Sequence, residues 1–107
     1  MTRWKAAETA IAKRLGGKRV PITGRARGDV PDLAPGVQWE WLSCEVKNRE
    51  VIPLWLLNGM KQARAAAKDG QLPVVILHKV GTRYSDSILC LSMSDFQLWF
   101  GGGSDAV

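Results

Sequence analysis

The feature that most constrains the fold is the alternation of side chains along residues 37–47. One set of alternate positions carries Val37, Trp39, Trp41, Ser43, Glu45 and Lys47, and the other set becomes apolar at Leu42, Cys44 and Val46. Because successive side chains of a strand point to opposite faces, this pattern predicts a strand over residues 37–47. Its end should enter the core and present Glu45 and Lys47 together on the opposite side.

An amphipathic helix is predicted over residues 3–15, where Trp4, Ala7, Ile11 and Leu15 recur at helical spacing and Gly16-Gly17 follows as a stop signal. Glu8 falls inside this apolar stripe. A carboxylate that points at the core is costly unless it is paired or binds a cation. Two interpretations follow: Glu8 contacts a metal ion, or it forms a buried salt bridge to an arginine such as Arg19.

The remaining segments predict an α/β chain of order α-β-β-β-α-β-β. They are a short strand over 19–22, a basic loop over 23–28, a strand that begins within 28–33, a turn over 34–36, a helix opened by Pro53 that runs to Lys68, a strand over 74–77, a strand over 87–91 and a short helix that starts near Ser94. This order favours a mixed central sheet with a helix on each face, in a single domain over residues 1–100. Residues 101–107 are predicted to be a flexible tail.

Composition agrees with one soluble globular domain. The chain has 107 residues, of which 46% are hydrophobic and 23% charged. No apolar run approaches the roughly 20 residues that a membrane span needs. The first residues lack the apolar stretch of a signal peptide, which predicts a cytoplasmic location. Cys44 and Cys90 lie in apolar runs and are predicted to be reduced core residues.

Positive charge is concentrated at one end of the chain. Residues 1–27 carry eight basic residues and the single acid Glu8, whereas the remainder carries seven basic and nine acidic residues. A one-sided basic surface raises the local concentration of a polyanion, so this distribution favours a nucleic-acid partner over a merely solvated helix face.

Asp32 and Glu45 are the candidate metal ligands. A hairpin through the turn at residues 34–36 would bring the two carboxylates together, and the backbone carbonyl of Val46 and waters would complete a shell around Mg²⁺ or Mn²⁺. Lys47 would position the attacking water and offset charge on a phosphate. Glu8 could add a metal contact, and Asp29 is the alternative to Asp32.

These residues resemble the PD-(D/E)xK nuclease superfamily. The resemblance is carried by Pro-Asp-Leu at 31–33, Glu-Val-Lys at 45–47, the helix with Glu8 and a later helix with Gln62, and it covers about residues 3–91. It implies a restriction-endonuclease-like αβββαβ core. Within the superfamily the chain is similar to archaeal-type and phage Holliday junction resolvases and to virus-type replication-repair nucleases. The resemblance implies a Mg²⁺-dependent endonuclease, a homodimer that cuts opposed strands, with Glu8, Asp32, Glu45 and Lys47 as its catalytic residues.

Sequence-independent contacts to DNA are expected from residues near this site. The candidates are Lys18, Arg19, Arg25, Arg27, Arg49 and Gln62. The expected function is structure-selective cleavage of branched DNA. The alternatives are a nicking or restriction-type nuclease on linear duplex, and an inactive nucleic-acid-binding protein on a nuclease fold.

Overall fold

The computed structural model describes residues 3–21 and 31–101. The chain is mixed α and β and divides into two compact units, residues 1–50 and residues 51–107. Within the described residues, each unit contains one two-stranded antiparallel sheet. The predicted mixed α/β class is confirmed, and the restriction-endonuclease-like αβββαβ core stays a prediction.

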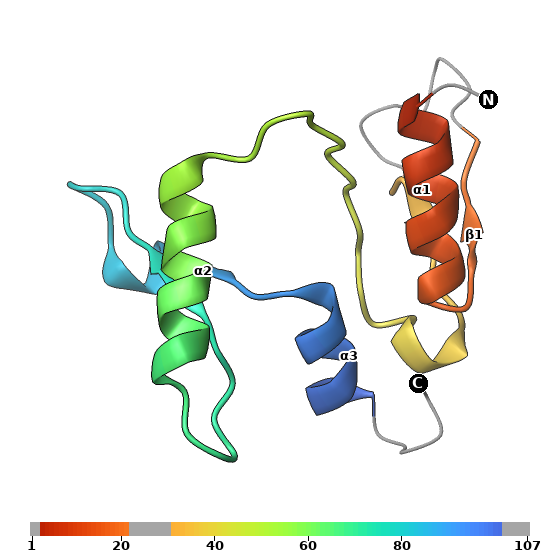
Figure 1. The fold of residues 1–107 in the computed structure, drawn as a ribbon. Helices are drawn as coiled ribbons and strands as arrows, with labels where there is room; N and C mark the ends of the chain where they lie inside the picture. The colour runs from red at the N-terminus through yellow and green to blue at the C-terminus, as the bar shows by residue number, and fades with distance from the viewer. Residues whose placement is uncertain (1–2, 22–30, 102–107) are drawn as a thin grey trace. The chain divides into compact units, whose positions relative to one another are not determined.

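Unit 1 begins with helix α1 (Arg3–Arg14), which lies along strand β1 (Lys18–Arg19) in Figure 1. Its buried face is formed by Glu8, Ala12 and Leu15, at the spacing of one helical face. The predicted inward direction of Glu8 is thus confirmed.

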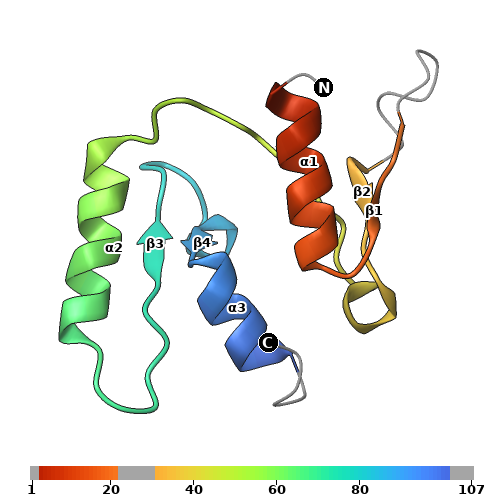
Figure 2. The same cartoon turned by 45° about the vertical axis from the view of Figure 1, so that its right-hand side comes forward.

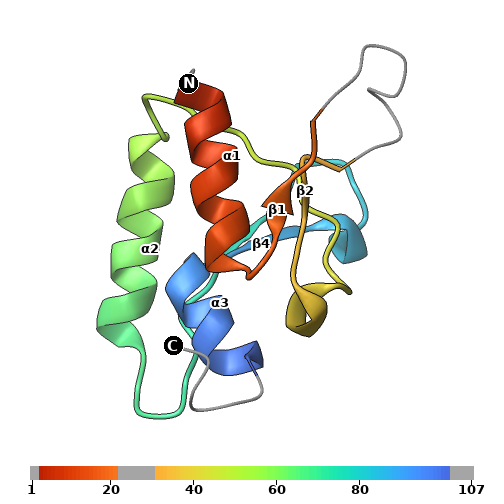
Figure 3. The same ribbon diagram turned by 90° about the vertical axis from the view of Figure 1, so that its right-hand side faces the viewer.

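Two glycines end α1 as predicted. Gly16 takes a φ of +68°, and its N–H donates to the Lys13 carbonyl at 2.9 Å. The Gly17 N–H donates to the Ala12 carbonyl at 2.8 Å, which completes a Schellman motif. The motif turns the chain back into β1, which pairs antiparallel with β2 (Leu33–Ala34) through Lys18↔Ala34 and Arg19↔Leu33. Figure 3 shows these two strands side by side.

The predicted strand over residues 37–47 is wrong, because no residue of this range is assigned to a strand. Val37–Trp39 form a 3-10 helix, and Glu40 and Trp41 form a turn. A strand would place Trp39 and Trp41 on one face with similar exposure. In the 3-10 turn their ring centroids lie 6.0 Å apart, but Trp39 is 4% exposed and Trp41 60%. Burial of one large indole in a compact turn therefore outweighs the local alternation. Residues 42–49 follow without assignment to a strand.

Unit 2 packs one helix on a hairpin. Helix α2 (Leu54–Ala66) begins after Pro53 and contacts β3 (Val75–Leu77), as Figure 2 shows. Strand β3 pairs antiparallel with β4 (Ile88–Cys90), and a short 3-10 helix, η2 (Tyr84–Asp86), precedes β4. Helix α3 (Met93–Phe100) ends the described chain.

The elements of unit 2 confirm the predicted segments, with shifts of at most two residues at their ends. The half-buried side of α2 includes Leu56, Met60, Ala63 and Ala67, as its spacing predicts. The prediction that the 74–77 strand is central in a larger mixed sheet is not borne out among the described residues, since β3 is paired there with β4 alone. His78 stacks on Tyr84 with 4.4 Å between ring centroids.

Candidate active site

Asp32 links the two sides of the candidate site through its backbone. Its N–H donates to the Cys44 carbonyl at 3.1 Å, while its own carbonyl accepts from the Val20 N–H at 3.0 Å. In a regular antiparallel pair, one residue exchanges both bonds with a single partner. Asp32 lies at a bend, so its N–H and carbonyl reach different neighbours. The segment around Cys44 is thereby held beside β2, as the predicted hairpin required.

The Asp32 side chain continues this link. It is 7% exposed, and its Oδ2 accepts a hydrogen bond from the Val46 N–H. Burial raises the pKa of the Cys44 thiol, and the negative charge of Asp32 raises it further. The buried carboxylate therefore lies among residues 44–46, directly beside the segment that carries Glu45.

Glu45 and Lys47 lie on the same side of their segment. Lys47 Nζ is 2.9 Å from Glu45 Oε2, and both side chains are exposed. The predicted shared direction of these two residues is confirmed even though no strand is assigned there. An exposed ion pair contributes about 0–1 kcal/mol, so a ligand can replace either partner at small cost.

Glu8 has a different environment from Asp32. Its Oε1 accepts from Arg19 Nε at 2.8 Å, and the Glu8 side chain is almost fully buried. The Arg19 guanidinium also lies 5.1 Å from the centroid of the Trp4 ring. The buried salt bridge that the sequence offered as one interpretation is thus present. A metal contact from Glu8 stays a prediction.

The predicted DNA-contact residues are distributed over both units. Lys18 and Arg49 are exposed in unit 1, whereas Arg19 is occupied by Glu8 and Trp4. Gln62 is exposed on α2 in unit 2. The remaining predicted positions, Arg25, Arg27 and the alternative ligand Asp29, lie outside the described residues.

The oxygen atoms around Asp32 suit a hard divalent cation. Mg²⁺ is bound through one or two carboxylates together with waters and substrate phosphates. Asp32 and Glu45, with the Val46 carbonyl between Glu45 and Lys47, offer such a set of donors. No group of three His, Cys, Asp or Glu residues arranged to hold a metal ion occurs within residues 3–21 and 31–101.

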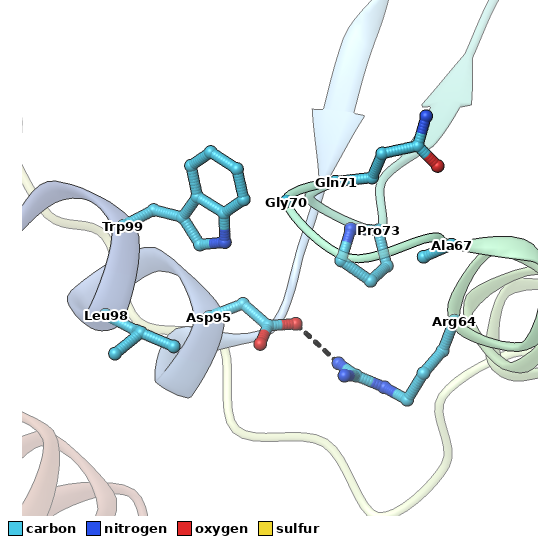
Figure 4. Close-up of a pocket in the computed structure, with 8 residues that line it drawn as sticks. All are labelled: Arg64, Ala67, Gly70, Gln71, Pro73, Asp95, Leu98 and Trp99. Atoms are coloured by element: carbon cyan, nitrogen blue, oxygen red, sulfur yellow. Dashed lines mark hydrogen bonds and ion pairs between the residues drawn. The ribbon is translucent and has the colours of Figure 1, made fainter.

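Unit 2 contains a hollow that the sequence did not indicate. Its volume is about 570 Å³, and Arg64 of α2 and Asp95 of α3 point toward one another across it and form an ion pair (Figure 4). The hydrogen bond from Arg64, and then that from Ser92, lower the pKa of Asp95. Ser92 caps α3 by accepting from the Asp95 N–H at 3.2 Å. The sequence signal for this arrangement was the Ser-x-x-Asp spacing before an apolar run.

Comparison with protein-family models, curated proteins and solved structures gives no match. Within the described part of the chain, no helix combines the length and apolar character that a membrane crossing requires.

Proposed function

We propose that this chain is a Mg²⁺-dependent, structure-selective DNA endonuclease that cuts branched DNA in the manner of a Holliday junction resolvase, on a restriction-endonuclease-like core. The observation that carries the proposal is the hydrogen bond between the buried Asp32 carboxylate and the Val46 N–H. It brings the Pro-Asp segment and the Glu-Val-Lys segment together. The homodimer implied by the resemblance belongs to the same proposal.

Charge supports Asp32 as the residue that receives a cation. Among the described residues, salt bridges form to Glu8 and Glu45 but none forms to Asp32. A carboxylate held by a backbone N–H keeps its full negative charge, and a buried charge favours a counterion. Mg²⁺ held by Asp32, Glu45 and the Val46 carbonyl would supply Lewis-acid polarisation of the phosphate and a more acidic water.

Lys47 acts from the exposed side of the segment. Its ammonium group has three donors and can exchange Glu45 for a water or a phosphate oxygen. It thereby orients the attacking water and offsets the charge that develops on the phosphorus centre. Lys18 and Arg49 hold neighbouring phosphates without reading sequence.

The test is cleavage of a labelled four-way junction and of its linear arms, each with and without Mg²⁺. Symmetric cuts confined to the junction are expected from the wild-type chain. Asp32→Asn, Glu45→Gln and Lys47→Gln should each reduce cleavage by about 10²–10⁴-fold, because each removes a charge from the reaction. Glu40→Gln, an exposed acid of the same unit, is the matched control and should cut normally.

Three results would contradict the proposal. Cleavage at the wild-type rate by Asp32→Asn or Lys47→Gln would exclude the proposed active site. Equal cutting of the linear arms would identify a nuclease of linear duplex, and junction binding without cleavage in Mg²⁺ or Mn²⁺ would identify a binding protein. A Glu8→Gln variant that needs more Mg²⁺ for half-maximal cleavage would indicate that Glu8 contacts the metal. An unchanged Mg²⁺ requirement would indicate that Glu8 only forms the salt bridge to Arg19.

A further inference from the structure

A second hollow in unit 1 lies along the same segment as Glu45 and Lys47. It has a volume of about 530 Å³ and is lined by Arg3, Trp4 and Ala6 of α1 and by Asn48, Arg49 and Glu50. This volume is within the range of sites that bind small ligands. None of the DNA contacts predicted from the sequence, apart from Arg49, belongs to it.

The lining places the Trp4 ring with the basic side chains of Arg3 and Arg49, and two further cations outside the lining lie over that ring. Trp4 is 47% exposed, and the Lys5 ammonium lies 5.3 Å from its ring centroid. The Arg19 guanidinium lies at a similar distance and is fixed by its bond to Glu8. Exposed aromatic rings beside basic side chains are the elements that bind single-stranded nucleic acid, where bases stack on the rings and cations hold phosphates.

The ion pair at this hollow leaves its arginine available. Arg3 Nη1 pairs with Glu50 Oε1, and both side chains are highly exposed. Such a pair contributes about 0–1 kcal/mol, so a phosphate can replace the glutamate at little cost. Arg3 also presents a planar fork of donors, which matches two phosphate oxygens. Asn48 adds a carboxamide that can both donate to and accept from a base edge.

The hollow is close in sequence to the proposed catalytic residues. Asn48 follows Glu45 by three residues, and three residues span at most about 11 Å. DNA advances about 3.4 Å per nucleotide along one strand of a duplex. A nucleotide bound at the hollow would therefore lie within about three steps of a phosphate at Glu45.

We infer that the hollow lined by Arg3, Trp4, Asn48 and Arg49 is a subsite for one unpaired nucleotide beside the cleaved bond. The base stacks on Trp4, and Arg3 and Arg49 hold its phosphate. The inference rests on the proposed function in taking DNA as the ligand, and it adds that the substrate has an unpaired nucleotide near the branch point.

The test measures binding, with Ca²⁺ in place of Mg²⁺. The probe is a fluorescent four-way junction with one single-stranded thymidine flank, in which a single abasic site is moved along the flank. In the wild-type chain one abasic position should weaken binding about 5- to 100-fold, the value of one stacked base. Trp4→Ala should lose the same factor on the intact flank, and that abasic site should then cost it nothing more.

Two variants serve as controls. Trp4→Phe keeps an aromatic face and should retain most of the affinity. Trp41→Ala removes an exposed indole outside the hollow and should keep both the affinity and the abasic effect. Far-UV circular dichroism of Trp4→Ala must match the wild type, since Trp4 lies in the first turn of α1.

Wild-type affinity of a folded Trp4→Ala, or abasic losses that simply add to the Trp4→Ala loss, would overturn the subsite. Cleavage in Mg²⁺ is scored separately. If the Trp4 and abasic effects are coupled but the wild-type chain does not cleave DNA, the subsite is supported and the nuclease proposal is contradicted. If the wild-type chain cleaves DNA but the two effects are not coupled, the nuclease proposal is supported and the subsite is contradicted.

Discussion

At the residue scale, the two carboxylates that are buried in the described part of unit 1 are satisfied in different ways. Glu8 is neutralised by a side-chain cation, Arg19, whereas the Asp32 carboxylate is held by the backbone amide of Val46. A neutral amide donor leaves the carboxylate charge in place, but a guanidinium cancels it. Within the proposed function, this difference makes Asp32 a stronger candidate than Glu8 for binding a divalent cation.

Removal of one partner of the Glu8–Arg19 pair should lower the free energy of unfolding, whereas replacement of both partners by apolar residues should change it little. Arg19→Met leaves the Glu8 charge buried and unpaired, so we expect a loss of about 3–5 kcal/mol in the free energy of unfolding. The double variant Glu8→Met/Arg19→Met should recover most of this loss, because a buried ion pair and an apolar pair are often similar in stability. Urea unfolding measures each difference. Lys13→Ala, an exposed position of α1, is the control. A double variant no more stable than Arg19→Met would contradict this account.

At the element scale, the turn that ends α1 packs closely against the backbone that follows β2 and thereby limits the position of β2. A Cβ built at Gly17 would lie 1.9 Å from the Ala34 carbonyl oxygen, and one built at Gly36 would lie 2.7 Å from the Gly16 carbonyl oxygen. The Gly36 N–H donates to the Leu15 carbonyl at 2.8 Å. The close approach of these two turns therefore aligns β1 with β2, and β2 in turn positions Asp32.

Gly17→Ala should disturb this approach. The clash is with backbone and cannot be relieved by a rotamer change, so we expect a loss of about 3 kcal/mol and faster amide exchange at Leu33. Gly70→Ala is the matched comparison. It has open space around it and carries only the cost of its φ of +82°, about 1–2 kcal/mol. A Gly17→Ala variant with wild-type stability would show that the two turns do not touch in solution.

The link between α2 and α3 should depend on pH. The Arg64 hydrogen bond, followed by that of Ser92, lowers the pKa of Asp95 in the folded chain. A group with a lowered pKa stabilises the fold above its unfolded pKa, near 3.9 for aspartate, and this contribution disappears as the pH falls through the folded value. Stability should therefore decrease on acidification below about pH 4. Asp95→Asn should reduce this dependence in urea titrations at successive pH values, whereas Asp69→Asn, at an exposed position, should preserve it. An unchanged pH dependence in Asp95→Asn would contradict the prediction.

At the scale of the whole molecule, charge is divided unequally along the chain. Eight of its fifteen basic residues precede position 28, and nine of its ten acidic residues follow it. The proposed active site and the Trp4 hollow both belong to unit 1, which also holds most of this positive charge. Unit 1 is therefore the expected DNA-binding unit.

Binding to a junction should weaken steeply with salt for this reason. The slope of log K against log salt is about −0.9 for each phosphate contact to duplex DNA. Lys18→Gln should make the slope shallower by about 1, since it removes one phosphate contact. Lys79→Gln changes an equally exposed lysine of unit 2 and should leave the slope unchanged. Equal slopes for Lys18→Gln and the wild type would exclude Lys18 from the interface. Fluorescence anisotropy across a salt series measures both variants.

The sequence alone determined where the three α-helices lie, together with the end of α1 and the start of α2. Gly16-Gly17 and Pro53 act on neighbouring backbone, and the apolar spacing of α1 already directed Glu8 inward. These are local signals, so they can be recognised without the rest of the chain. The alternation over residues 37–47 was local too, yet no strand is assigned there, and Trp39 is buried in a 3-10 turn.

Only the tertiary structure decided the partners of the two acids. Arg19 is eleven residues from Glu8, and Val46 is fourteen residues from Asp32, so each contact depends on how separate segments pack. Spacing could place Glu8 on an inner face and Asp32 near a turn, but it could not choose between a cation and a backbone amide as partner. That choice depends on burial and distance in the folded chain, because the cost of a buried charge is set by its three-dimensional surroundings.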